Sequence, residues 1–482
     1  LCLGTLAAIH YTSAGLALAH FDARAHLVVA RRVLDSLTPG WQQVGAVWLP
    51  LPHVLNILPV QVDAWYRTGA SAIALSVVSM ALAVWALADL LRRTTGSVAA
   101  GVAGAVLMLG NANVLYLQSA PMTEPQLFGT CMLAVALTAR WVERGAPLPP
   151  RAAGWAIVAA CMTRYEAWPV CGALIVLAGL VLLRQGCPAA HALRACARLA
   201  VYPAVALVLF SANSRWTTGT WFVPSGFFVP DPESLGSIGR SWEHVRHSVY
   251  ALSGTAWVWP AYAGTALIAG AFAKSRRHAP LVLLVALAAA ACVPGYAYYQ
   301  GHPVRLRYGL PLVIACAALA AAGLAVLPVR LRGLAAAAVV AWALVQAPPL
   351  GREVLLVTES LRDRNNRQGR EVVTDYLRQH WDHTPVMMSM GSLAHYMHDL
   401  SAIGLNLRDF LHEGNEYLWM YSVSAGPQGF VRWVIIEEYA EGGDALYQAA
   451  ARNPQFFRGF QRVAEGGGVA LYRDDRLVLR TP

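Results

Sequence analysis

Charged side chains are scarce in this sequence. Asp, Glu, Lys and Arg make up 13% of the 482 residues, about half the share found in soluble globular proteins, whereas 57% of the residues are hydrophobic. Only residues 350–482 have the composition of a soluble protein. The net charge of +10 comes from basic residues that lie beside apolar segments rather than on a soluble face. This pattern excludes a nucleic-acid-binding protein and favours membrane lipids as partners.

The sequence also lacks the signatures of several enzyme classes. It has no G-x-x-x-x-G-K-[ST] or G-x-G-x-x-G nucleotide loop, no G-x-S-x-G nucleophile motif and no cysteine-based metal site. None of the eight cysteines lies beyond Cys316, so residues 350–482 have no disulfide framework. Nothing in the sequence therefore supports ATP hydrolysis, and any chemistry must come from ordinary polar side chains.

Long apolar segments dominate the rest of the chain. About eleven of them are long enough to be membrane spans or half-spans. They lie at residues 1–20, 70–91, 97–117, 125–142, 152–164, 167–183, 198–213, 249–273, 279–298, 308–327 and 332–348. We interpret the first as a trimmed transmembrane helix; the alternative is a signal peptide, for which Ala17-Leu18-Ala19 would suit the cleavage site. The sequence predicts a polytopic α-helical membrane protein.

Basic residues predict the orientation of these spans. Every second connection is short and basic, as at Arg92 and Arg93 or at Arg276 and Arg277, which indicates the cytoplasmic side. The outward segments are then residues 21–69, 118–124, the turn at Arg164, 214–248 and 299–307. An odd number of spans also places residues 350–482 outside. The Ala-, Arg- and Gly-rich composition favours a bacterial inner membrane.

The chain is predicted to have two parts, a transmembrane catalytic domain at residues 1–349 and an extracytoplasmic α/β domain at residues 350–482. Helical periodicity or helix-start signals appear at 371–380, from Ser392, and at 443–451. Strand patterns appear at 385–390 and 433–436, and a terminal hairpin is predicted from 459–463 and 469–472.

The first outward loop, residues 21–69, is rich in groups that could perform chemistry. Asp22 and His26 are four residues apart, which places them on one face of a helix, while Arg24 and Arg31 share another face. His53 follows in a Trp- and Pro-rich stretch. Arginines bind phosphate in a bidentate way, so the loop suits an anionic lipid head group. The alternatives are that Asp22 only caps a helix and that the arginines only anchor the loop at the membrane.

Three other outward segments also carry charge beside apolar spans. They contribute Glu124 at a helix start, Arg164 with Glu166 in a tight turn, and Arg305, Arg307 and Tyr308 before a span. A carboxylate near hydrocarbon is costly and is a functional hypothesis by default. The alternatives are a helix cap for Glu124, a self-neutralising Arg164–Glu166 pair and interfacial anchoring for the last group.

These features resemble the GT-C superfamily of membrane glycosyltransferases, which includes protein O-mannosyltransferases, aminoarabinose lipid A transferases and the catalytic subunit of oligosaccharyltransferase. The run Phe21-Asp22-Ala23-Arg24-Ala25-His26-Leu27 is similar to the loop that holds the catalytic Asp of this superfamily. The loop with Glu124 is similar to the place where many members have a second acid. The resemblance in architecture covers nearly the whole chain.

The resemblance implies a transferase that uses a polyprenyl-phosphate sugar and an unidentified glycan, lipid or protein acceptor. Asp22 and Glu124 would be the catalytic residues and could share a divalent cation, Mg or Mn. Paired acids are absent here, in contrast to some members, since Ala23 follows Asp22 and Glu124 stands alone. The implied substrate-binding residues are Arg24, His26, Arg31, His53, Arg164, Glu166, Arg305, Arg307 and Tyr308.

Two other function classes compete with this interpretation. A transporter or lipid flippase would have charges in mid-span and helices broken by Gly or Pro, and Pro169, Pro203 and Pro294 are compatible with it. A membrane-anchored sensor would bind its ligand in residues 350–482. The clustering of unusual charges on one predicted face favours the transferase.

Overall fold

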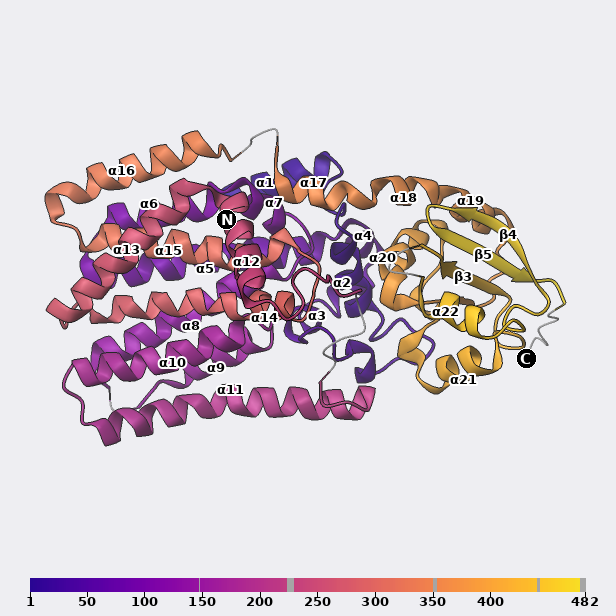
Figure 1. The fold of residues 1–482 in the computed structure, drawn as a ribbon, viewed down its shortest axis with the longest axis horizontal. Coiled ribbons are helices and arrows are strands. Elements are labelled where there is room, and N and C mark those ends of the chain that lie inside the picture. The colour runs from indigo at the N-terminus through magenta and orange to yellow at the C-terminus, as the bar shows by residue number, and fades with distance from the viewer. Residues whose placement is uncertain (147, 223–228, 350–352, 440–442, 477–482) are drawn as a thin grey trace.

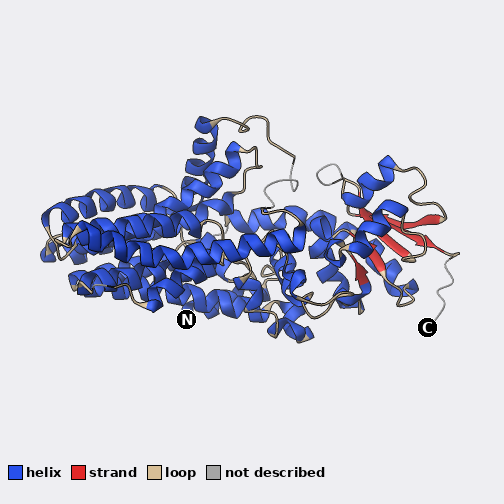
Figure 2. Ribbon diagram, turned by 90° about the horizontal axis from the view of Figure 1, so that it is seen from below, coloured by secondary structure: helices blue, strands red, loops and turns tan. Residues whose placement is uncertain are grey.

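The computed structural model describes residues 1–146, 148–222, 229–349, 353–439 and 443–476. A long bundle of helices is joined at one end to a domain that contains a β-sheet (Figure 1). The view from below shows that all the strands gather at this end (Figure 2). The described chain is thus a helical membrane bundle with a small sheet domain, as the sequence predicts.

The bundle helices correspond to the predicted apolar segments. They are α1 (Cys2–Ser13), α5 (Ala70–Thr95), α6 (Val98–Leu109), α7 (Ala112–Gln118), α8 (Glu124–Arg144), α9 (Arg151–Cys161), α10 (Ala167–Arg184), α11 (Ala189–Thr218), α13 (Thr255–Lys274), η3 (Ala279–Ala291) with α14 (Cys292–Tyr299), η4 (Leu306–Gly309) with α15 (Leu310–Val326), and α16 (Val329–Gln346). Helix α12 (Ile238–Ser253) lies outside the predicted spans for most of its length.

Seven helices in the described part of the chain are long and apolar enough to cross a membrane. The number is eight if α6 and α7, which meet at a 71° bend, form one span. Helices α1 and α9 have only 12 and 11 residues, and α8 has 21 residues but charged side chains at both ends. The chain is therefore an integral membrane protein, and the count of eleven spans stays a prediction.

Close packing of α13 against α15 depends on two glycines. A Cβ on Gly323 would lie 2.3 Å from the Cα of Gly264, which is closer than atoms can approach. Small residues let helix backbones approach one another in a membrane, where no hydrophobic effect drives association. These two glycines therefore set the spacing in the middle of the bundle.

The sheet domain has five strands in the order β2-β1-β3-β5-β4. Strand β1 (Val386–Met388) pairs in parallel with β2 (Phe410–Leu411) and β3 (Trp433–Glu437), while β5 (Val469–Asp474) is antiparallel to β3 and to β4 (Phe460–Gly466). The predicted strands and terminal hairpin are confirmed. The helices are α17 (Leu355–Ser360), α18 (Arg364–Gly369), α19 (Glu371–His380), α20 (Met390–Leu400), α21 (Tyr417–Ala425) and α22 (Ala445–Arg452).

The first loop forms a layer between the bundle and the sheet domain (Figure 1). Its elements are α2 (Phe21–Arg31), η1 (Trp41–Val44), α3 (Leu51–Val54), η2 (Pro59–Gln61) and α4 (Asp63–Thr68). Leu27 and Val28 of α2 belong to the same buried apolar core as Val386 and Trp433 of the sheet. The first loop and the sheet domain thus share one core, although the boundary near residue 350 separates them in sequence; residues 350–352 lie outside the described ones.

Burial of Glu437 at the end of β3 makes the stability of this domain depend on pH. Burial and the nearby Asp444 carboxylate raise the pKa of Glu437 to about 7, against the opposing effect of Arg370. The folded state therefore keeps a proton that the unfolded chain releases near pH 4.5, so stability falls as the pH rises from about 4.5 to about 7. We expect the thermal unfolding midpoint of the full chain in detergent to fall over this range and Glu437→Gln to flatten the slope.

Asp444 makes stability depend on pH in the same direction, because burial raises its pKa to about 6. In Glu437→Gln, the fall of the unfolding midpoint with rising pH is therefore reduced rather than abolished. Glu465→Gln is a suitable control because that side chain is 65% exposed. An unchanged slope in Glu437→Gln would contradict the assignment.

Candidate active site

Asp22 lies in the first turn of α2, at the boundary between the first loop and the bundle. The helix begins after His20, whose Nδ1 accepts a hydrogen bond from the Asp22 backbone N–H at 3.0 Å. A carboxylate in the first turn also suits the positive end of the helix dipole. Its side chain forms an ion pair and hydrogen bond with Arg307, from the short η4 that precedes α15. Asp22 is therefore more than a helix-start residue, because its carboxylate is engaged by a residue 285 positions away.

Arg307 joins Asp22 to the second predicted acid. Its Nη1 lies 3.9 Å from Oε1 of Glu124, the first residue of α8. The same oxygen lies 3.1 Å from Nη1 of Arg164, and Arg164 Nη2 lies 2.8 Å from Glu166 Oε1. We call these five residues, Asp22, Glu124, Arg164, Glu166 and Arg307, the acid–arginine cluster. Helices α2 and α8, the turn that precedes α10, and η4 thus bring three carboxylates and two guanidiniums to one place.

Several polar atoms of the acid–arginine cluster lack hydrogen bonds despite being buried. Among the residues that the structure describes, both Glu124 carboxylate oxygens and the Nε and Nη1 atoms of Arg307 have no hydrogen-bond partner. Side-chain exposure is 1% for Glu124 and 10% for Arg307. A buried donor without a partner costs free energy, and such groups are typical of sites that a ligand completes.

The surroundings of Asp22 keep it ionised and its histidine neighbours neutral. Burial alone would raise the pKa of Asp22, but the Arg307 guanidinium holds it below its ordinary value. Burial, reinforced by Arg307, lowers the pKa of His20 to about 3. At neutral pH, Asp22 is therefore a carboxylate and His20 an uncharged imidazole that can accept the Asp22 N–H.

A pair of histidines adjoins the acid–arginine cluster. His26 Nδ1 lies 3.1 Å from His53 Nε2, and the Trp48 ring centroid lies 4.1 Å from that of His26. Burial lowers the pKa of both, for His53 to about 3 and for His26 well below its usual range, with His53 contributing to the shift of His26. The structure confirms that His26 follows Asp22 on the same side of α2, since the two interact electrostatically.

Arg305 and Tyr308 flank Arg307 in sequence and in space. The Arg307 guanidinium carbon lies 5.5 Å from the Tyr308 ring centroid. Arg305 is near enough to lower the pKa of His20, although burial is the larger cause. Both residues therefore lie near the acid–arginine cluster, and their predicted role in substrate binding stays a prediction.

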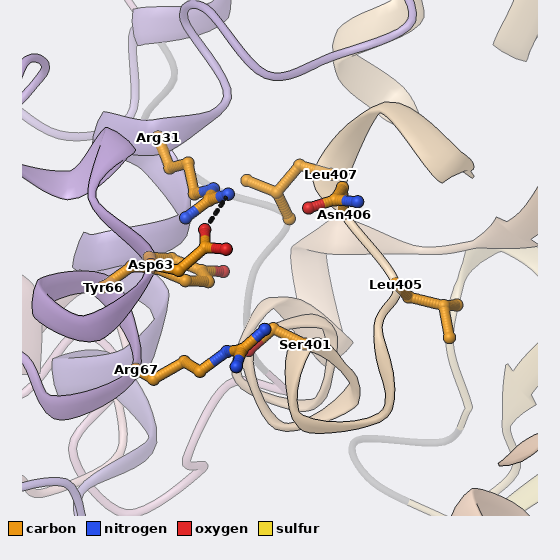
Figure 3. A pocket seen from close by; sticks show the side chains of 8 residues that line it. All are labelled: Arg31, Asp63, Tyr66, Arg67, Ser401, Leu405, Asn406 and Leu407. Atoms are coloured by element: carbon orange, nitrogen blue, oxygen red, sulfur yellow. Dashed lines mark hydrogen bonds and ion pairs between the residues drawn. The ribbon is translucent and has the colours of Figure 1, made fainter.

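Two predicted substrate-binding residues, Arg24 and Arg31, face away from the acid–arginine cluster. Arg24 forms an ion pair with Asp399 of the sheet domain. Arg31 Nε lies 2.9 Å from Asp35 Oδ2, and Arg31 Nη2 lies 2.7 Å from Asp63 Oδ1. Arg31 also lines a shallow surface pocket between the first loop and the sheet domain (Figure 3). The reason is helical geometry: residues two apart on a helix point in nearly opposite directions, so Arg24 cannot follow Asp22.

Glu359 is a further carboxylate near the acid–arginine cluster that the sequence does not predict. Glu359 belongs to α17, and its Oε2 is buried without a hydrogen-bond partner among the described residues. Burial raises its pKa, while Arg307, Arg362 and Arg305 oppose the shift. It is 52 residues from Arg307 in sequence and inside the region assigned to the soluble domain, so no local pattern indicated it. His20 and Thr123, which accepts a hydrogen bond from Arg164 at 2.9 Å, were also missed.

A small apolar cavity, with a volume of about 20 Å³, lies beside Glu166 of the cluster. The residues that line it are Leu127, Phe128, Cys131, Val170, Leu287, Ala290, Pro311 and Ile314, together with Glu166. They come from α8, α10, η3 and α15. An apolar cavity that meets a charged cluster suits a molecule with a hydrocarbon tail and an ionic head.

Comparison with known proteins gives the fold. No family model and no curated protein sequence matches the chain. The crystal structure of ArnT from Cupriavidus metallidurans bound to undecaprenyl phosphate covers 100% of this chain and 99% of its own, with a TM-score of 0.57 and 13% identity. The chain shares the ArnT fold. The apo structure of the same protein agrees, with a TM-score of 0.56, 12% identity, and coverage of 94% of this chain and 93% of its own.

The ArnT fold confirms the architecture expected from the GT-C resemblance. Because the match covers nearly the whole of both chains, the bundle, the first loop and the sheet domain all belong to the shared fold. The acid–arginine cluster lies where these three parts meet, formed by residues of the first loop and of the bundle.

Proposed function

We propose that this protein is a membrane glycosyltransferase that moves a sugar from a polyprenyl-phosphate donor to an acceptor. The observation that carries the proposal is the acid–arginine cluster, in which Arg307 has nitrogens without hydrogen-bond partners among the described residues and Glu166 lines an apolar cavity. This arrangement offers guanidinium donors to a phosphate and apolar walls to a polyprenyl tail. The shared fold with an ArnT structure that is bound to undecaprenyl phosphate supports the choice of donor class.

The reaction in this proposal is a displacement at the anomeric carbon of the donor sugar. An acceptor hydroxyl or amine forms the new bond to that carbon, the bond between the carbon and the phosphate oxygen breaks, and the electron pair leaves with the phosphate. Arg307 and Arg164 stabilise the negative charge that grows on the leaving phosphate. The acceptor proton passes to the Asp22 carboxylate, which acts as the general base.

The Asp22–Arg307 ion pair links donor binding to base strength. As long as Arg307 holds Asp22, the carboxylate is a weak base, because the guanidinium favours its ionised form. A donor phosphate that takes hydrogen bonds from Arg307 weakens this hold and raises the proton affinity of Asp22. The base thus becomes effective when the donor is present.

The other members of the site hold and orient the substrates. Glu124 fixes the two arginines by contacting both, and Glu166, which lines the cavity, holds Arg164 by an ion pair. The remaining positions proposed to contact substrate are His26, His53, Arg305 and Tyr308. Arg24 and Arg31 receive no substrate role, since the carboxylates of Asp399, Asp35 and Asp63 engage their guanidiniums.

The sequence predicts a divalent cation shared by Asp22 and Glu124, and the surroundings of these two carboxylates bear on whether one could fit. In this arrangement Arg307 contacts both carboxylates and Arg164 also contacts Glu124, so guanidiniums take the place that a cation would need. The described residues contain no group of three or more His, Cys, Asp or Glu side chains that could hold a metal. The residues therefore do not fit Mg or Mn here, and no step is assigned to a metal.

We further propose that the protein lies in a bacterial inner membrane with the acid–arginine cluster and the sheet domain outside. Gly96 follows α5 on the predicted cytoplasmic side, whereas Gly369 ends α18 in the sheet domain. Alkaline phosphatase and fluorescent-protein fusions at these two positions are expected to report opposite sides. If both report the same side, the proposed orientation is wrong.

A transporter or lipid flippase is the second candidate. The 71° bend between α6 and α7 favours it, because broken helices are typical of transporter sites. The acid–arginine cluster argues against it, since this cluster lies at the end of the bundle beside the sheet domain rather than in mid-span. A flippase moves its lipid without breaking a bond, which provides the discriminating experiment.

The test uses the purified full-length protein in nanodiscs with a polyprenyl-phosphate sugar and a lipid extract that contains acceptors. Mass spectrometry follows the donor and free polyprenyl phosphate. A transferase releases polyprenyl phosphate and adds the sugar mass to one acceptor species, whereas a flippase leaves the donor intact. In cells that lack the protein, the donor is expected to accumulate while one surface glycan disappears, and the identity of that glycan names the sugar and the acceptor.

A further inference from the structure

Helix α2 is held between two ion pairs that point in opposite directions. Asp22 faces the bundle and meets Arg307, while Arg24 faces the sheet domain and meets Asp399. The apolar side chains divide in the same way, since Ala23 belongs to the core of the bundle and Leu27 belongs to the core shared with the sheet domain. The helix that presents Asp22 is therefore clamped from both sides.

Arg24 is held by a network of ion pairs and hydrogen bonds within the sheet domain. Besides Asp399, Arg24 faces Asp363, whose carboxylate lies 3.7 Å from Nη2. Asp399 also accepts a hydrogen bond from Arg367 at 3.1 Å. Asp363 Oδ2 lies 3.5 Å from Arg370 Nη1. Arg370 Nη2 in turn lies 3.4 Å from Oε1 of Glu437 on β3. The guanidinium of Arg24 is thus one end of a chain of charges that reaches the central strand of the sheet.

Helix α2 depends on its contacts with the rest of the protein to keep its orientation. The Arg24 side chain is only 1% exposed, so its charge depends on these two carboxylates. The helix has 11 residues, which is too few for a stable isolated helix in water. The orientation of α2 is therefore set by its contacts, and on the domain side Arg24 supplies the ion pairs of this helix, with Asp399 and Asp363.

We propose that Arg24 is a positioning residue through which the sheet domain holds the Asp22 carboxylate in place for catalysis. This inference rests on the proposed function, in which Asp22 is the general base. Arg24 touches neither donor nor acceptor. It acts by fixing α2, and a displacement of about 1 Å at a reacting group can cost up to about 100-fold in rate.

The test measures kcat and KM for the polyprenyl-phosphate sugar with full-length variants in nanodiscs. Arg24→Met is expected to lower kcat by about 10- to 100-fold and to leave the donor KM unchanged. Arg24→Lys, which keeps the charge, is expected to recover most of the loss. Asp399→Asn removes the partner instead, preserves side-chain size and remains informative if Arg24→Met does not fold.

A double-mutant cycle separates positioning from general damage. Because Arg24 and Asp399 act through one contact, the Arg24→Met/Asp399→Asn double variant is expected to lose little more activity than the more affected single variant. Arg378→Met is the control, because it breaks an exposed Arg–Asp pair within helix α19 of the same domain. This control is expected to keep full activity.

Three outcomes would overturn the inference. A raised donor KM with unchanged kcat would place Arg24 in contact with the donor. Additive losses in the double variant, or full activity in Arg24→Met, would remove the coupling to Asp399. Asp22→Asn is measured in parallel: if it keeps full activity, the proposed function fails and this inference fails with it, whereas an inactive Asp22→Asn beside a fully active Arg24→Met overturns the positioning role alone.

Discussion

Asp22→Asn is expected to lower the rate of sugar transfer by about two to four orders of magnitude, the usual contribution of a general base. Asn keeps the size of the side chain and can still accept a hydrogen bond from Arg307, but it cannot take a proton from the acceptor. The loss therefore falls on kcat. The measurement is the release of polyprenyl phosphate by purified protein in nanodiscs, followed by mass spectrometry over a range of donor concentrations.

Asp63→Asn provides the matched control for this experiment. Asp63 belongs to the same loop and also pairs with an arginine, but its side chain is 57% exposed and its partner, Arg31, lies outside the acid–arginine cluster. We expect this variant to transfer sugar at a rate close to that of the wild type. Full activity in Asp22→Asn would reduce Asp22 to a structural residue at the start of α2 and would turn attention to transport.

Arg307→Met is expected to cause the largest loss of stability among substitutions in the acid–arginine cluster. It leaves the buried carboxylates of Asp22 and Glu124 without the cation that faces both, and breaking a buried ion pair from one side typically costs about 3–5 kcal/mol. Transfer activity should be lost as well, because the phosphate loses a guanidinium. The measurement is the midpoint of thermal unfolding in detergent, followed by tryptophan fluorescence and by the recovery of monodisperse protein on heating.

Two further variants show whether the unpaired charge is the cause. Arg307→Met/Asp22→Asn removes one of the stranded carboxylates and is expected to regain part of the lost stability while remaining inactive. Arg240→Met breaks an ion pair whose two side chains are 59% and 50% exposed, and we expect almost no shift in its midpoint. If Arg307→Met unfolds at the same temperature as the wild type, Asp22 and Glu124 do not depend on Arg307 for their charge balance.

Much of the acid–arginine cluster could be predicted from the sequence because one physical rule selects its members. Charges beside apolar spans are costly, and the alternation of basic connections placed Asp22, Glu124, Arg164 and Arg307 on the same face of the membrane. The structure brings all four together. The Arg164–Glu166 ion pair, which the sequence offers as the alternative to a functional role for these two residues, forms part of the same cluster.

The residues that the sequence placed wrongly or missed depend on contacts between distant parts of the chain. Arg24 pairs with a residue 375 positions away, and no local pattern distinguishes such an arginine from one that binds phosphate. The position of Glu359 near Arg307 could not be predicted for the same reason, because Glu359 belongs to the segment that the sequence assigns to the soluble domain. Strand β2, with two residues, is too short to give any periodic signal.

The apolar core that α2 shares with the sheet has a consequence for anyone who builds hybrids of this protein. Four side chains of this helix, Ala25, Leu27, Val28 and Ala30, pack in the core of the module at the other end of the chain, and Leu27 and Val28 are fully buried there. A chain truncated near residue 350 would leave these side chains in water beside the reacting groups. Exchange of the sheet domain between related enzymes should therefore carry the first loop with it, so that the natural unit of exchange is discontinuous in sequence.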